Sequence, residues 1–108
     1  MNFEDLTIFI NEYSQKLESK FGKYEDKEKL ILSSTVKLSE ELGELCDEVL
    51  TFNSRQRKEK LDNHTTENLP AEFADVILAV FMLAKDMDIN LDEAVQNKME
   101  KIKTKHFN

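Results

Sequence analysis

The chain has 108 residues, of which 40% are apolar and 34% are charged, so it can bury one hydrophobic core and is not a disordered tail. Its net charge of -7 argues against a protein that binds nucleic acid through broad attraction to phosphates. The single cysteine excludes an intramolecular disulfide, and the longest apolar run, 76–84, is too short to span a membrane. We expect one domain, residues 1–108, in a soluble cytoplasmic protein.

Four segments have helical periodicity, and two glycines and one proline leave little material for sheets and turns. Apolar residues repeat every three or four positions over 3–17, and Gly22 stops or bends this segment. A second helix is expected over about 26–52, followed by a polar loop or solvated helical extension. A third follows Pro70, and a fourth starts near Asn90, with Glu93 as its capping partner. The sequence therefore predicts an all-α bundle of four to five helices.

The third expected helix, in the stretch "LPAEFADVILAVFMLA", is apolar on almost every side. A helix that is apolar on all faces is normally buried on all faces. We do not expect three other helices from so short a chain to enclose it. We therefore predict a homodimer or a dimer of dimers with this helix near the subunit interface; a tightly wrapped monomer is the alternative.

The second expected helix carries a crowded set of carboxylates: Glu40, Glu41, Glu44, Asp47 and Glu48. Like charges three or four residues apart on a helix repel by about 0.2–0.5 kcal/mol per pair. Glu41, Glu44 and Glu48 fall on one narrow strip of the helix, with Lys37 the only cation beside them. Gly43 costs about 1 kcal/mol in a helix, which indicates close approach by backbone or ligand.

The only charges inside the apolar third helix before Lys85 are Glu72 and Asp75, which are three residues apart and share a face. If this pair faces the glutamate strip, four or five carboxylates converge with no protein cation to balance them. Mg²⁺ or Mn²⁺ prefers such an all-oxygen site, with open positions for water and phosphates. The alternative for either acidic group by itself is a solvated face.

Other chemistries do not fit these residues. No Glu-x-x-His pair is present, which argues against a ferritin-like di-iron site. The stretch 86–97 resembles a calcium loop at its start, but Leu91 and Asn97 occupy the positions that need glycine and glutamate. There is no glycine-rich phosphate loop, and Cys46 is expected to be a small buried residue rather than a nucleophile.

The pair "EELGE" and "EFAD", at 40–44 and 72–75, resembles the E-E-x-x-E … E-x-x-D signature of the MazG-like nucleotide pyrophosphohydrolases, an all-α superfamily. The resemblance covers roughly residues 30–105. It implies Mg²⁺-dependent hydrolysis of nucleoside or deoxynucleoside triphosphates to the monophosphate and pyrophosphate, by dimers or dimers of dimers.

Residue by residue, the resemblance implies four metal ligands: Glu41, Glu44, Glu72 and Asp75. Glu40 and Glu48 would lie beside them and orient water. Lys37 would either hold a phosphate or form an ordinary ion pair with Glu41.

The last helix departs from the family pattern. Ile102 stands near an expected asparagine, and lysines replace an expected arginine. Lys98, Lys101 and Lys105 recur at helical spacing and would either meet phosphates or form a solvated face.

Three aromatic residues have two interpretations: Phe9, Tyr13 and Phe21. They would either stack on a nucleobase or pack in the helical core, and we favour packing. A non-catalytic module that binds metal and nucleotide, or a partner protein, is the alternative to the enzyme. A purely structural oligomeric bundle is a third hypothesis.

Overall fold

The computed structural model describes residues 1–53 and 68–107, and within them it contains helices and no strand. The helices are α1 (Phe3–Phe21), α2 (Lys27–Asn53), α4 (Asn68–Asp86) and α5 (Leu91–His106). The all-α prediction is confirmed. Most of the expected polar segment after α2 lies outside the described residues. None of the described helices combines the length and the apolar character that a membrane span requires.

The helix ends follow from local side-chain chemistry. At the start of α1, Asn2 and Asp5 form a reciprocal capping box, with each side chain accepting the other's backbone N–H at 2.9 Å. At its end, Gly22 adopts a φ of 87°, a left-handed conformation that glycine tolerates without a Cβ penalty. The side chain of Asn90 accepts the N–H of Glu93 at 3.1 Å and caps α5, as predicted.

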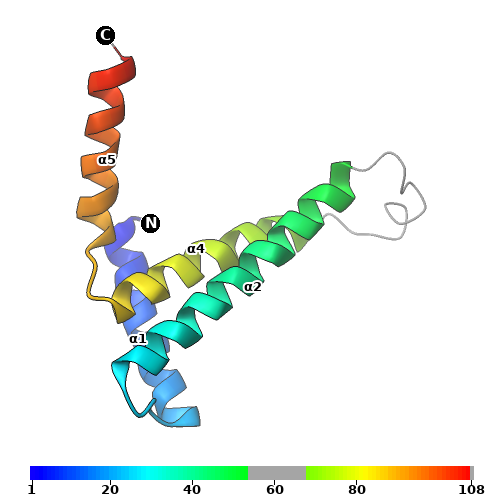
Figure 1. The fold of residues 1–108 in the computed structure, drawn as a ribbon, viewed down its shortest axis with the longest axis vertical. Coiled ribbons are helices and arrows are strands. Elements are labelled where there is room, and N and C mark those ends of the chain that lie inside the picture. The colour runs from blue at the N-terminus through cyan, green and yellow to red at the C-terminus, as the bar shows by residue number, and fades with distance from the viewer. Residues whose placement is uncertain (54–67, 108) are drawn as a thin grey trace.

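The helices form an antiparallel hairpin with two further helices at one end (Figure 1). α2 and α4 run side by side, and the contact between them is the most extensive in the described chain. α1 packs against α4 near the C-terminal end of α4, and α5 packs mainly on α1 and points away from the hairpin. The α2–α4 hairpin is therefore the element that brings the two acidic segments together.

The core lies where α1 meets the C-terminal half of α4. Ile10, Phe81 and Ala84 are its buried apolar residues among those described. The rings of Phe3 and Phe81 pack with their centroids 5.4 Å apart. This small core fixes α1 against α4, and that contact sets the position of α1 beside the hairpin.

One chain does not bury α4 on every face. Phe73, Ile77 and Val80 are all exposed. The radius of gyration is 17.4 Å, against about 13 Å for a compact domain of 100 residues. A large apolar surface of α4 is thus left uncovered by the described part of the chain.

One expectation about α2 was wrong, and the expected close approach to Gly43 stays a prediction as far as a ligand is concerned. Cys46 is exposed, so the prediction of a buried cysteine was wrong. Five residues after Glu41, it points about 140° away from the face that packs on α4. No described neighbour lies within 4 Å of a Cβ placed on Gly43, so no other helix approaches that glycine closely.

The buried position of Ile10 generates a stability prediction. Ile10→Ala is expected to lower the free energy of unfolding by about 2–5 kcal/mol, because it opens a cavity at a side chain only 2% exposed. Ile8→Ala, on the same helix but 51% exposed, is the matched control and should change it by about 0.5 kcal/mol or less. Urea unfolding followed by circular dichroism measures both. Equal losses would contradict the assignment of the core.

Candidate functional site

The α2–α4 hairpin brings three carboxylates to one point. Glu41 projects from α2, and Glu72 and Asp75 project from α4, one helical turn apart. One ligand oxygen from each of the three side chains lies within 4.8 Å of the others. The predicted convergence of the two acidic segments therefore occurs in the folded chain.

Two oxygens of this trio lack hydrogen-bond partners. Glu41 is buried and Glu72 is partly buried, and the Oε2 atom of each is enclosed with no partner among the described residues. Enclosing an ionised carboxylate oxygen without a partner is costly, because it loses water and gains nothing in return. Converging oxygens that lack partners are the donor set that a hard divalent cation takes, so the residues present fit Mg²⁺ or Mn²⁺.

Lys37 partly offsets the negative charge of the trio. Its Nζ lies 2.9 Å from Oε1 of Glu41, one helical turn further along α2. The hydrogen bond to Glu41, and then the charge of Glu41, raise the pKa of Lys37 above its usual value. The ion pair expected as one alternative for Lys37 is therefore present, and the expectation that no protein cation balances the converging carboxylates was wrong for Glu41. Among the described residues, three carboxylates face one ammonium group, so these four groups together keep a net negative charge.

The remaining acids of α2 lie around the trio rather than in it. Glu44 and Glu40 are exposed, and Glu48 is partly buried. The charges of Glu44 and Glu48 nevertheless act on Glu72, so both lie near it. Glu44 contributes no oxygen to the close group among the described residues, and its role as a ligand stays a prediction.

The predicted phosphate-binding lysines of the last helix lie elsewhere. Lys98 and Lys101 are exposed on α5, which packs mainly on α1 and diverges from the hairpin (Figure 1). Neither lysine lines the cavity beside the acidic trio. Their role in phosphate binding stays a prediction, and in this arrangement it would need a second copy of the chain.

A cavity of about 870 Å³ opens beside the trio, between α1, α2 and α4. Glu41, Asp75 and Lys37 are part of its wall. Aromatic rings form another part of the lining: Phe9, Tyr13, Phe21 and Tyr24. All four are about half exposed or more, so the favoured interpretation of the first three as core residues was wrong.

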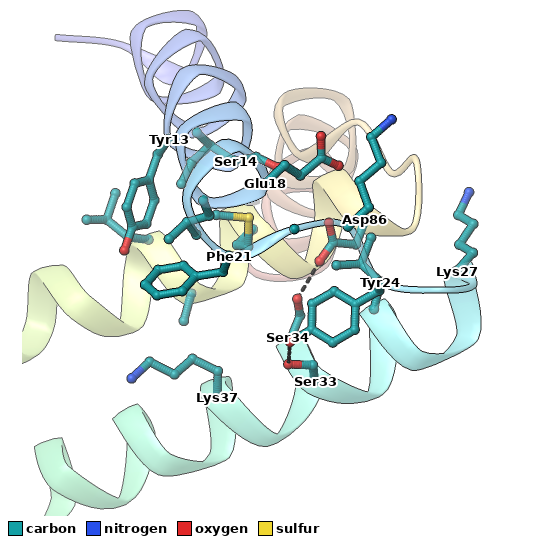
Figure 2. A pocket seen from close by; sticks show the side chains of 18 of the residues that line it. Tyr13, Ser14, Glu18, Phe21, Tyr24, Lys27, Ser33, Ser34, Lys37 and Asp86 are labelled. Carbon is teal, nitrogen blue, oxygen red and sulfur yellow. Dashed lines mark hydrogen bonds between the residues drawn. The ribbon is translucent and has the colours of Figure 1, made fainter.

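The sequence analysis missed the far end of this cavity, which is lined by Tyr24, Ser33, Ser34 and Asp86 (Figure 2). A spacing signal was available for two of them. Ser34 precedes Glu41 by seven residues and Asp86 follows Asp75 by eleven, and both spacings return to the same helix face. The signal became interpretable only once the two helices were known to be neighbours.

The pKa of Glu72 records the electrostatics of the trio. Burial, and then the charges of Glu44, Asp75, Glu41 and Glu48, raise the pKa of this carboxyl above its ordinary value. The folded protein therefore binds this proton more tightly than the unfolded chain does. Stability is then lost as the pH rises from the ordinary glutamate range through the folded pKa, and it is not lost below that range.

Glu72→Gln is consequently expected to raise the melting temperature of the metal-free protein at neutral pH. The gain should disappear when the pH falls below about 4, where glutamate is protonated in both states. Thermal melts across this pH range, with a chelator present, measure the effect. Glu12→Gln, at an exposed glutamate of α1, is the control and should give no such pH-dependent gain. A pH-independent gain in Glu72→Gln would contradict the electrostatic account.

Comparison with known proteins identifies the family to which this chain belongs. Residues 31–108 match the MazG nucleotide pyrophosphohydrolase domain. The chain is also 35% identical over 75 residues to the uncharacterized protein YpjD of Bacillus subtilis (strain 168). That alignment covers 68% of this chain and 65% of the relative, just under two thirds of its length. No solved structure matches the chain. The match over most of the chain, in an all-α fold, makes this protein a member of the MazG nucleotide pyrophosphohydrolase domain family.

Proposed function

We propose that this chain hydrolyses nucleoside or deoxynucleoside triphosphates to the monophosphate and pyrophosphate, in the cytoplasm and with Mg²⁺, which Mn²⁺ can replace. One observation supports this most directly: Glu41, Glu72 and Asp75 converge from two helices, and an oxygen of Glu41 and one of Glu72 are enclosed without a hydrogen-bond partner among the described residues. Glu41 and Asp75 also lie in the wall of a cavity of about 870 Å³, within the size range of small-molecule sites. Family membership supports the same reaction class.

Four carboxylates would hold the cation: Glu41, Glu44, Glu72 and Asp75. When bound, the cation would offset the charge of the phosphate oxygens and make an attacking water more acidic. Lys37, with an exposed side chain next to Glu41, can turn its ammonium group toward a phosphate. Glu40 and Glu48 lie on the same stretch of α2, where their carboxylates can orient water.

In the proposed reaction the water oxygen bonds to the α-phosphorus, and the bond from that phosphorus to the bridging oxygen breaks. Pyrophosphate leaves with the electrons of the broken bond, and the water proton passes to a neighbouring carboxylate. The trio contains no histidine, so in this proposal the proton acceptor is a carboxylate of α2 that orients the water, Glu40 or Glu48.

We also propose that the protein is a homodimer or a dimer of dimers. Support comes from the exposed apolar residues of α4, Phe73, Ile77 and Val80, and from the large radius of gyration of 17.4 Å. A monomer that exposed this surface would lose the free energy of burying it, about 25 cal/mol per Å² of apolar area. A second copy with the same face is the simplest apolar partner, because a two-fold interface pairs a patch with itself.

The enzymatic proposal predicts metal-dependent turnover. Purified protein with Mg²⁺ and a panel of ribo- and deoxynucleotides should release pyrophosphate and monophosphate in equal amounts. Glu44→Gln and Asp75→Asn should reduce turnover about a hundredfold or more, and should leave metal-free stability unchanged or higher. They should also lose the rise in melting temperature that Mg²⁺ gives by mass action.

Glu12→Gln is the control for these variants and should retain both turnover and the metal response. A metal response without pyrophosphate from any nucleotide would favour the non-catalytic binding module. If neither a metal response nor pyrophosphate release is observed, a purely structural bundle is favoured.

Two equally exposed isoleucines provide a test variant and a control for the oligomer proposal. Ile77→Asp places a charge on the uncovered face of α4, whereas Ile89→Asp places one in the turn after α4. Each isoleucine is 49% exposed in the single chain. Analytical ultracentrifugation should show dissociation or insolubility for Ile77→Asp and an unchanged oligomer for Ile89→Asp. A wild-type protein that sediments as a monomer would contradict the proposal.

A further inference from the structure

A buried carboxylate lies at the end of the cavity away from the acidic trio. Asp86, the last residue of α4, is only 4% exposed. Its Oδ2 accepts a hydrogen bond from the hydroxyl of Ser34 on α2, as Figure 2 shows. Its Oδ1 is enclosed and has no hydrogen-bond partner among the described residues. The cavity therefore has a second acidic feature, separate from the trio and with an unused acceptor.

Holding α2 and α4 together through the Ser34 hydrogen bond does not require a carboxylate at this position. Asp86 forms no ion pair among the described residues, and two of the lysines that line the same cavity pair with other acids: Lys27 with Asp88 and Lys37 with Glu41. An asparagine could accept the same hydrogen bond from Ser34 without a buried charge. A charged group with an orphaned oxygen is costly unless a donor reaches it.

The two ends of the cavity have the spacing of a nucleotide. Ser34 and Glu41 are seven residues apart on one face of α2, about 10 Å of helix. Asp75 and Asp86 are eleven residues apart on one face of α4, about 16 Å. A nucleoside 5′-phosphate has a comparable length from its phosphate to the far edge of its base. With phosphates near the trio, the base would therefore reach Asp86.

Aromatic rings line the same cavity. Tyr13 and Phe21 come from α1, and Tyr24 comes from the link between α1 and α2 (Figure 2). The hydroxyl of Tyr24 is hydrogen-bonded to that of Ser33 at 2.6 Å, which fixes this ring beside Ser34. Rings at least partly exposed to a cavity offer faces on which any base can stack, so they provide affinity without selecting one base.

We propose that Asp86, held by Ser34, selects nucleotides whose base carries an exocyclic amino group; this rests on the function proposed above. A carboxylate only accepts hydrogen bonds. The amino group of cytosine, adenine or guanine donates to it, as aspartate and glutamate accept from cytosine N4 in other complexes. Uracil and thymine offer one N–H between two carbonyl oxygens, which the carboxylate repels. Asp86 is therefore a specificity-determining residue.

The test compares substrates that differ at one exocyclic group, CTP with UTP and ATP with ITP, in the ribo or deoxy series. Wild type should favour the amino-bearing member of each pair about tenfold or more in kcat/KM. Asp86→Asn should reduce this preference to within about threefold, because an amide can also donate. Asp92→Asn, on α5, is the control and should keep the wild-type preference.

Ser34→Ala keeps the carboxylate but removes the hydroxyl that holds it, and should reduce the preference at least about twofold. If Asp86→Asn does not fold, the base preferences of Ser34→Ala and of wild type still test the proposal. Equal or reversed preference in wild type, or a preference unchanged in the folded variants, would overturn the proposal.

A binding measurement separates this proposal from the enzymatic one. Calorimetry with the non-hydrolysable α,β-methylene analogues of CTP and UTP, in Mg²⁺, should give the same preference in wild type and the same loss in Asp86→Asn. Selective binding without turnover would support base selection and reject catalysis. Turnover without base preference would support catalysis and reject base selection. No binding of either analogue would overturn the base-selection proposal.

Discussion

The central constraint is the repulsion between carboxylates that the α2–α4 contact forces together. The hairpin is the largest helix contact of the described chain, and it encloses oxygens of Glu41 and Glu72 without hydrogen-bond partners. Apolar burial elsewhere along α4 must offset this cost. The single ion pair between Lys37 and Glu41 relieves only part of it. A fold that tolerates such a cluster is preorganised for a cation, which is the basis of the proposed activity.

The same hairpin leaves an apolar face uncovered. α4 presents the acids and part of the cavity on one side and apolar side chains on another. The other described helices do not cover the apolar side, and the buried apolar core comprises only Ile10, Phe81 and Ala84 among the described residues. The proposed oligomer would cover the apolar side and leave the acidic side to substrate.

α1 forms a wall of the cavity that differs in chemistry from the acidic hairpin. Ile10 anchors the helix in the core, and its neighbours on the helix line the cavity wall opposite the hairpin. Carboxylates of Glu41, Asp75 and Asp86 line the cavity, and so do the aromatic rings. Phosphates, with their counter-cation, and a base with donor groups are complementary to these carboxylates. Reaction and base selection would thus depend on different residues of one hairpin.

Helix content, the start of α5 at Asn90 and the end of α1 at Gly22 were predictable from the sequence, because periodicity and caps are local properties. So was the pairing of the two acidic segments, because charges within an apolar helix need a partner nearby. The exposure of Cys46 and the position of the aromatic rings in the cavity wall were not. These depend on how helices cross and on which faces stay uncovered. The tertiary structure alone assigned Asp86 and Ser34 to the same cavity as Glu41, because residues 52 positions apart meet only when α2 and α4 pack antiparallel.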